Sequence, residues 1–200
     1  MASKMDIINL ALANLSREPI QSLSEPNPEA FQLRVHWETA LASVLRDHPW
    51  GFAMRRRPLA ALAESSIGFA YAYAYPEDCI QARRIMPSRV VGPWRGRTAF
   101  PFEVGRSLDG RHKAILTEVP DAALEYTTRQ VPCEEFDPQF VGALAWRLAA
   151  EISLALHADP QLHQAALTTY SAQLQQAKAL DMRESVSPRL PDGDFLASRN

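Results

Sequence analysis

Cysteine is scarce in this sequence: Cys79 and Cys133 are the two cysteines among its 200 residues. Their spacing matches no metal-ligand or redox motif, and we expect them to stay reduced inside a cell rather than to form a disulfide. A chain of this length can bury a hydrophobic core without cross-links. Hydrophobic residues make up 46% of the sequence, as in ordinary globular proteins. The composition therefore predicts one compact domain, with room for a smaller appendage.

Long apolar runs are missing as well. The longest ones are short and interrupted, so we expect no membrane-spanning segment. Residues 1–14 lack the basic and apolar regions of a signal peptide and are typical of an amphipathic helix. We therefore expect the protein to be made in the cytoplasm and to stay there until it is assembled with something else.

Motifs of catalysis and of metal or cofactor binding are also missing. The sequence has no Gly-rich phosphate loop, no G-x-S-x-G elbow, no C-x-x-C pair and no H-x-x-x-H pair. It thus predicts no catalytic residue, no metal site and no cofactor. One alternative, a glycoside-cleaving enzyme, stays open. Glu134, Glu135 and Asp137 are carboxylates, the groups that glycosidases use as acid and base. We favour the interpretation that acidic residues precede a helix, whose dipole attracts them.

Charge is unevenly distributed along the chain, although the formal total is only −2. Residues 51–115 hold 11 basic and 5 acidic residues, a formal charge of +6. Residues 116–184 hold 4 basic and 10 acidic residues, a formal charge of −6. Such a division favours contacts between unlike surfaces, either within one molecule or between neighbouring copies.

Five arginines form the candidate site with the densest charge. Arg55, Arg56 and Arg57 are consecutive, and Arg83 and Arg84 follow later in the same basic region. Clustered cations could contact nucleic-acid phosphates, with Trp94 available for stacking on a base. We favour contacts with acidic patches of another subunit, because no nucleic-acid-binding motif accompanies the cluster. Whether the arginines face DNA or protein stays open at this point.

Four helices are predicted, and several of them have a recognisable start. We expect them at residues 3–15, 27–48, 138–158 and 160–181. Ser3 and Asp6 form a capping-box-like pair, and Asn27, Asp137 and Asp159 each precede a proline that suits a first helical turn. The short turn between the last two helices predicts that they pack as an antiparallel hairpin.

The middle of the chain, about 66–130, is predicted to be β structure. Strands are expected at 69–75, 79–85, 99–106, 113–117 and 124–129, with a hairpin turn at Asp109-Gly110 and a loop over 86–97. Tyr71, Tyr73 and Tyr75 alternate with alanine. This stripe favours one buried sheet face, and a sugar-stacking platform is the alternative.

The predicted fold class is α+β, mainly α. An antiparallel helical bundle over residues 1–184 would carry a small inserted antiparallel β subdomain. Residues 185–200 are rich in Ser, Pro, Arg, Asp and Gly, with scattered apolar side chains, and we expect a flexible C-terminal tail there.

Four groups of short motifs follow one another along the chain. In order, they are Ile8-Asn9-Leu10-Ala11-Leu12 with Ile20-Gln21-Ser22-Leu23 and Asn27-Pro28-Glu29-Ala30; His48-Pro49-Trp50-Gly51-Phe52-Ala53 with Arg57-Pro58-Leu59; Tyr73-Ala74-Tyr75-Pro76-Glu77-Asp78-Cys79-Ile80; and Phe136-Asp137-Pro138-Gln139-Phe140 with Ala177-Lys178-Ala179. With this ordered set the chain resembles the tail tubular protein A family, the head-to-tail adaptors of podovirus-type phages. The match spans most of 1–184, is poorest over 86–111 and does not include the tail.

The resemblance implies a structural protein of the virion neck, with no catalytic residue. It implies a ring of typically twelve copies that binds the portal protein, offers a platform to the tail nozzle protein and continues the channel for genomic DNA. We expect Val186, Leu190, Phe195 and Leu196 to contact the portal, because apolar residues scattered in a polar tail suit an anchoring arm. Arg55, Arg56, Arg57, Arg83 and Arg84 would lie at a subunit interface or at the DNA channel.

Two other functions stay open as alternatives. The first is a virion-associated peptidoglycan-degrading enzyme that uses Glu134 and Glu135. The second is a host DNA-binding regulator that uses the arginine cluster, which would bind duplex DNA in a salt-dependent way.

Overall fold

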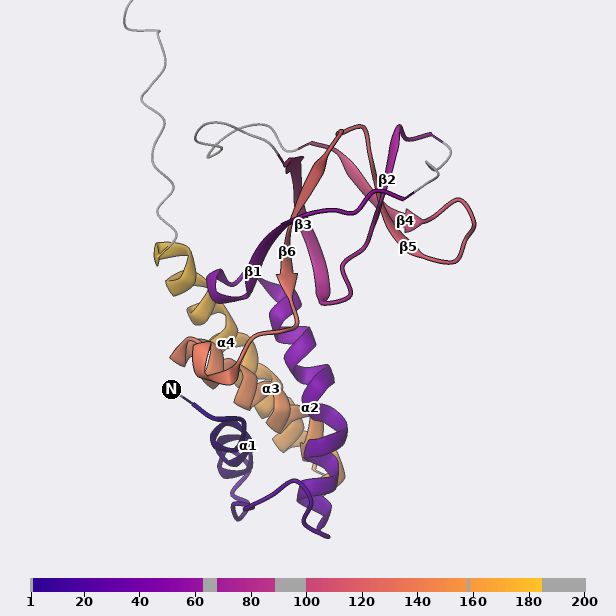
Figure 1. Cartoon of the computed structure of the whole chain (residues 1–200). Helices are drawn as coiled ribbons and strands as arrows, with labels where there is room; N and C mark the ends of the chain where they lie inside the picture. The colour runs from indigo at the N-terminus through magenta and orange to yellow at the C-terminus, as the bar shows by residue number, and fades with distance from the viewer. Residues whose placement is uncertain (1, 63–67, 89–99, 158, 185–200) are drawn as a thin grey trace, which may run out of the picture. The chain divides into compact units, whose positions relative to one another are not determined.

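The protein is described by a computed structural model that covers residues 2–62, 68–88, 100–157 and 159–184. It is an α+β protein with four α-helices: α1 (Lys4–Ala13), α2 (Pro28–Asp47), α3 (Pro138–His157) and α4 (Pro160–Glu184) (Figure 1). The four predicted helices are therefore present. The largest difference is at the end of α4, which continues to Glu184 instead of ending at residue 181.

Side chains at the helix starts form the caps that the sequence predicts. Ser3 and Asp6 make a capping box at the start of α1. The side chain of Asn27 accepts a hydrogen bond from the Ala30 N–H at 2.8 Å. Asp137 and Asp159 do the same at the starts of α3 and α4, where each accepts from a backbone N–H two residues later. Because these caps satisfy N–H groups that have no partner inside the helix, they fix where each helix begins.

One hydrophobic core joins residues of all four helices. Its largest fully buried side chains are aliphatic residues of α1 and α2 together with two aromatic residues, Trp50 and Phe140. Trp50, Phe52, Phe136 and Phe140 pack against one another with ring centroids 4.9–6.1 Å apart. Aromatic groups bury much apolar area each, so this cluster is a main contribution to the stability of the helices.

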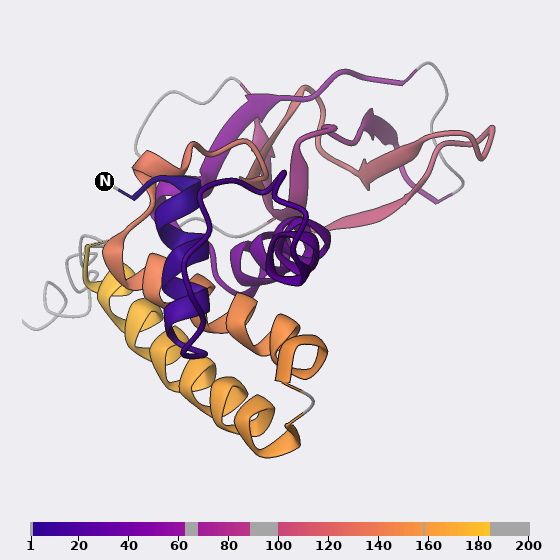
Figure 2. The same cartoon turned by 90° about the horizontal axis from the view of Figure 1, so that it is seen from below.

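Helices α3 and α4 run antiparallel, as the short turn between them predicts (Figure 2). Ser153 late in α3 contacts His163 early in α4, with 3.0 Å between Oγ and Nδ1. Earlier in α3, the Arg147 guanidinium lies 5.5 Å from the Tyr170 ring. A late residue of α3 thus contacts an early residue of α4, and an earlier residue of α3 contacts a later residue of α4, as antiparallel packing requires.

Helix α3 meets the length and hydropathy that a membrane-spanning helix needs, which contradicts our prediction that no segment would do so. Half of that window is buried inside the protein. The core helix of a globular domain has the same properties, because it is apolar on most of its faces.

Two three-stranded antiparallel sheets form the β structure. One has the strand order β1-β6-β3, with β1 at Met54–Pro58, β6 at Ala122–Thr128 and β3 at Cys79–Pro87. The other has the order β2-β5-β4, with β2 at Tyr71–Ala74, β5 at Lys113–Thr117 and β4 at Phe102–Arg106.

The observed strands correct three details of the prediction. Strand β1 was not predicted, and the β structure begins at Met54 rather than at about residue 66. Met86 and Pro87 belong to β3 instead of the loop predicted over 86–97. The rest of that loop from residue 89 on, and the predicted tail at 185–200, lie outside the described residues.

The predicted hairpin is confirmed. Strands β4 and β5 pair in antiparallel register, with Val104 opposite Ile115. Gly110 in the connecting turn has φ +69°, a left-handed conformation that glycine adopts without steric cost. Gly105 lies where an added Cβ would stand 2.9 Å from Leu116 Cδ1, so a larger residue there would displace that side chain.

The tyrosine stripe does not form one buried face, and that interpretation is wrong. Tyr73 is buried, whereas Tyr71 is 39% exposed and Tyr75 is half-buried. The small apolar cluster of this sheet lies on the alternate positions, where Ala72 packs with Ala114 and Leu116. Side chains on successive residues of a strand point to opposite faces, so the alanine face carries this cluster instead of the tyrosine face.

The chain divides into two compact units. The first unit comprises Met1–Arg55, Asp78–Ala82 and Tyr126–Met182, and it holds nearly all of the four helices. The second comprises Arg56–Glu77, Arg83–Glu125 and Arg183–Asn200, and it holds the whole of the β2-β5-β4 sheet.

Replacing Tyr73 by Phe should destabilise the second unit. The Tyr73 hydroxyl donates to the Val119 carbonyl at 2.9 Å and accepts from the Ala122 N–H at 3.3 Å. Both backbone groups would lose a buried partner, so we expect the free energy of unfolding to fall by about 1–3 kcal/mol in urea denaturation. Tyr71→Phe is the matched control and should change it by less than about 0.5 kcal/mol. Equal losses in the two variants would contradict the role given to the Tyr73 hydroxyl.

Candidate functional site

The three consecutive arginines lie on strand β1, at one edge of the β1-β6-β3 sheet. Arg55, Arg56 and Arg57 are all exposed to solvent. Because side chains alternate along a strand, Arg55 and Arg57 point to one face and Arg56 to the other. Charged residues on an edge strand also hinder unspecific strand pairing, which gives this run a structural role as well as a binding one.

Arg56 has an acidic partner in its own unit. Its Nε donates to Oε2 of Glu125, on the neighbouring strand β6, at 2.5 Å. The Arg56 side chain is 66% exposed, so solvent screens this ion pair and its contribution to stability is small. Its main effect is to orient the Arg56 side chain.

Arg83 and Arg84 lie on strand β3, at the opposite edge of the same sheet. Arg83 is half-buried and Arg84 is exposed. Since β6 separates β3 from β1, the fold distributes the five predicted site residues over the two edges of the sheet. The arginine run on β1 is therefore the more concentrated candidate.

A pocket of about 240 Å³ lies beside the arginine strand in the second unit. Arg56, Arg57 and Ser88 supply its polar groups, and the apolar lining consists of Pro58, Met86, Pro87 and Ala123. This volume is below the usual range for cofactor and drug-sized ligands. The pocket is therefore small for ligands of that kind.

The His-Pro-Trp motif connects the end of α2 with the last turns of α4. His48 Nε2 donates to Oδ2 of Asp181 at 2.8 Å, and the Gly51 N–H donates to Oδ1 of the same carboxylate at 3.0 Å. The indole N–H of Trp50 donates to the Val44 carbonyl at 2.8 Å. These hydrogen bonds fix the direction of the backbone where it leaves α2. The role of the motif is therefore structural, and we call this set of contacts the clamp.

Asp78, in the third motif, makes a second such contact. Its carboxylate accepts from the Tyr126 hydroxyl at 3.0 Å and from the Thr128 hydroxyl at 2.7 Å. The backbone carbonyl of Asp78 also accepts from the Arg129 N–H at 2.8 Å. A carboxylate that receives several hydrogen bonds joins the start of β3 to the end of β6. The His-Pro-Trp motif and the motif that contains Asp78 thus both have structural roles in this chain.

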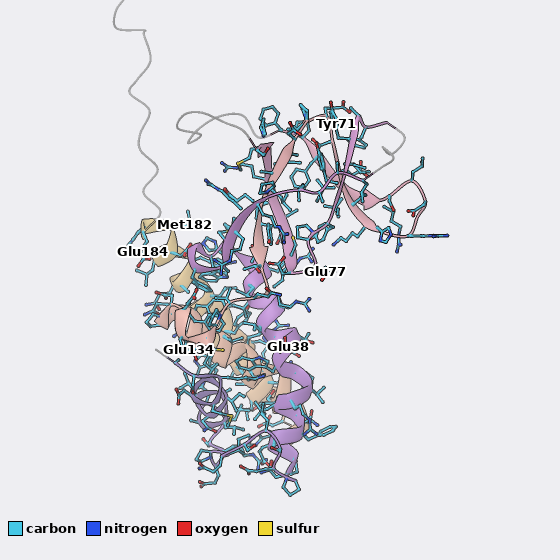
Figure 3. All side chains as sticks on the ribbon, in the orientation of Figure 1. Glu38, Tyr71, Glu77, Glu134, Met182 and Glu184 are labelled. Carbon is cyan, nitrogen blue, oxygen red and sulfur yellow. The ribbon has the colours of Figure 1, made fainter. Side chains whose placement is uncertain are left out.

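An acidic surface lies around Cys133 in the first unit. Glu134 and Glu135 stand on a short 3-10 turn (Cys133–Glu135), and Glu38 comes from α2 (Figure 3). All three carboxylates are exposed. Burial of the thiol raises the pKa of Cys133, and the negative charges of Glu134 and Glu38 raise it further, whereas Lys4 lowers it. Charges from three separate elements therefore meet near this thiol.

The positions of Glu134 and Glu135 do not favour the glycosidase alternative. A glycosidase needs its two carboxyl groups on opposite sides of the scissile bond, with a pocket between them for the sugar. Glu134 and Glu135 are neighbours on one exposed turn. Asp137 is engaged as the cap of α3, where it accepts from the Gln139 N–H at 2.7 Å.

The histidines of the helices have ordinary partners. His157 Nε2 accepts from the Arg17 guanidinium at 3.1 Å, and His163 lies 3.0 Å from both Ser153 Oγ and the Ala150 carbonyl. These contacts give each histidine a partner at the turn between α3 and α4. Within the described ranges, no group of three or more His, Cys, Asp or Glu side chains is arranged to hold a metal ion.

The tail residues predicted to contact the portal, Val186, Leu190, Phe195 and Leu196, lie outside the described part of the chain. The chain matches no protein-family model and no curated protein. The resemblance to the tail tubular protein A family therefore stays a prediction, and its support comes from the residues themselves.

Replacing Asp78 by Ala should destabilise the first unit, because the Tyr126 and Thr128 hydroxyls would lose a shared charged acceptor. We expect the free energy of unfolding to fall by about 2–4 kcal/mol, since each bond to a charged group contributes more than a neutral one. Thermal unfolding followed by circular dichroism measures the change. Glu77→Ala, at the exposed neighbouring position, should leave it almost unchanged (Figure 3). Asp78→Ala with wild-type stability would show that the carboxylate does not join the strands.

Proposed function

We propose that the chain is the structural head-to-tail adaptor of a short-tailed phage. It would form a ring between the portal protein and the tail nozzle protein and would continue the channel through which genomic DNA passes without sequence specificity. In this proposal the protein is made in the host cytoplasm and ends in the virion neck. The observation that carries the proposal is the ordered set of four motifs, two of which contain residues that join distant parts of the fold.

Two of the four motifs join parts of the chain that lie far apart in the sequence. His48 depends on Asp181, which is far along the chain, and Asp78 depends on Tyr126 and Thr128. In both cases the carboxylate accepts hydrogen bonds from groups within the same fold, which supports a structural role. The scaffold that we propose is an antiparallel helical bundle with an inserted β subdomain, in which the paired helices α3 and α4 give each subunit a rigid wedge.

The same proposal uses the charge distribution. A ring subunit must offer two different surfaces to its two neighbours, because a contact that repeats around an axis is heterologous. Unlike charges on the two parts of one chain suit such contacts. Typically twelve copies would follow the symmetry of the portal.

Negative-stain electron microscopy of the purified protein mixed with its portal ring tests the function directly. We expect an extra layer of density on one end of the portal, with the symmetry of the portal. The portal alone and the portal with an unrelated folded protein are the controls. A folded protein that adds no layer would contradict the adaptor function.

Deleting residues 185–200 should abolish binding to the portal while the rest of the protein still folds. The physical reason is that Val186, Leu190, Phe195 and Leu196 would bury apolar surface only when a partner is present. Cosedimentation with the portal measures binding, and circular dichroism checks the fold. Full binding by the shortened protein would show that the anchor lies elsewhere.

A further inference from the structure

The hairpin of β4 and β5 in the second unit places two basic side chains directly opposite each other. In its antiparallel register, Arg106 of β4 pairs with Lys113 of β5. Both side chains are exposed to solvent, and paired residues lie on the same face of a sheet. Like charges that stand opposite on neighbouring strands are destabilising, because they repel each other at short range. The stability of the hairpin therefore does not account for this pair.

Neutral groups hold the two cations in place. The Arg106 guanidinium donates to the Gly110 carbonyl at 3.0 Å. The Lys113 ammonium lies 3.6 Å from the centre of the Tyr75 ring. Neither partner is an anion, so both side chains keep their charge, and the guanidinium has further N–H donors for another acceptor. These contacts orient the two cations without neutralising them.

The connecting turn adds a third cation, Arg111, which is exposed as well. The acidic residue of the turn is engaged within it, because the Asp109 carboxylate accepts from the Ser107 hydroxyl and from the Arg111 N–H. These hydrogen bonds, that of Ser107 first, lower the pKa of Asp109, so this carboxyl is ionised at neutral pH. Residues 106–113 contain three Lys or Arg and one Asp, a formal charge of +2 with His112 neutral. We call these residues the basic turn.

The basic turn extends beyond the neighbouring strand of its sheet. The register of β2 with β5 ends where Ala74 stands opposite Ala114, and the hairpin continues past this point (Figure 1). Glu103, the acidic residue of β4, lies three positions before Arg106 and therefore points to the opposite face. The end of the hairpin is thus a narrow two-stranded ribbon that carries three exposed cations.

We propose that the basic turn binds the phosphate backbone of duplex DNA. A phosphate bound by both Arg106 and Lys113 would remove the repulsion between them, and Arg111 would bind another phosphate. The inference deepens the proposed function and rests on it for the origin of the DNA, which in an adaptor would be the genome in the channel. Contacts to phosphates carry no sequence information, so a protein that makes them can slide along DNA.

Duplex DNA suits the basic turn better than an acidic protein surface does. Phosphates repeat along each strand about every 3.4 Å of the helix axis, whereas the carboxylates on a protein surface have no regular spacing. The major groove of B-DNA also admits a two-stranded β-ribbon. The formal charge of −2 on the whole chain does not prevent the contact, because at moderate ionic strength charges more than about 10 Å away are largely screened.

Neutralising the three cations tests the site. The first variant carries Arg106→Gln, Arg111→Gln and Lys113→Gln. The matched control removes three exposed charges elsewhere in the chain, by Arg34→Gln, Arg129→Gln and Arg183→Gln. Fluorescence anisotropy of a labelled duplex of mixed sequence measures the affinity of the full-length proteins over a range of salt concentrations. Circular dichroism confirms that each protein is folded.

We expect the first variant to bind the duplex at least about 10-fold more weakly at low salt, because its phosphate contacts are lost. The plot of log affinity against log salt concentration should become shallower by about 0.9 for each lost contact. The control should keep the affinity and the salt dependence of the wild type. Arg111→Gln alone covers the case in which the triple variant does not fold, and it should reduce the slope by about 1.

Three results would overturn the inference directly. They are a wild-type protein that does not bind duplex DNA at low salt, a triple variant with wild-type affinity, and an equal loss of affinity in the control. Loss of binding in a variant with Arg55→Gln and Arg84→Gln, while the triple variant binds normally, would assign the DNA to those arginines instead.

Competition experiments distinguish DNA from other anions. Unlabelled duplex should displace the labelled duplex, whereas polyglutamate and inorganic phosphate should do so poorly at an equal concentration of charged groups. Equal displacement by polyglutamate would assign the basic turn to an acidic protein surface, and equal displacement by inorganic phosphate would assign it to a free anion. A portal without an added layer would contradict the adaptor function, and it would leave a DNA affinity that depends on the basic turn intact.

Discussion

The carboxylate of Asp181 ties the end of α2 to the last turns of α4, and the exit of the chain from the helices depends on this contact. It accepts from His48 at 2.8 Å and from the Gly51 N–H at 3.0 Å, with both side chains largely shielded from water. Hydrogen bonds to an ionised group are stronger in such surroundings. Trp50, between His48 and Gly51, is buried against Phe140. The residues that make the polar contacts with Asp181 are therefore next to the centre of the aromatic cluster.

The position of the arginine strand follows from that clamp. After His48-Pro49-Trp50 the chain forms one 3-10 turn and enters β1 at Met54, where the three arginines begin one residue later. A strand so rich in arginine has little apolar side-chain area with which to hold itself in a sheet. Its direction must therefore be set by the residues before it and by pairing with β6. The His-Pro-Trp segment therefore contributes to where the arginines of β1 lie.

The sequence predicts the helices well because their signals are local. Asn27 and Asp137 lie next to the N–H groups that they cap, and the apolar spacing of each helix spans only a few turns. Strand β1 has no such signal: Arg55, Arg56 and Arg57 show no alternation of apolar and polar residues. The tyrosine stripe does alternate with alanine, as a strand with two different faces should. Which of the two faces is buried depends on the elements that cover the sheet, and the sequence of the strand alone does not show this. Asp181 and Asp78 act on partners far along the chain, so their roles become visible only in the fold.

The arginine run shows why a charge cluster in a sequence does not by itself define a site. The sequence presents three equal cations, whereas the fold gives Arg56 a carboxylate of its own and places its two neighbours on the other face. An exposed ion pair within one subunit adds little stability, and an exposed charge with no partner costs little. Exposure of Glu38, Glu134 and Glu135 is for the same reason no evidence of a binding site by itself.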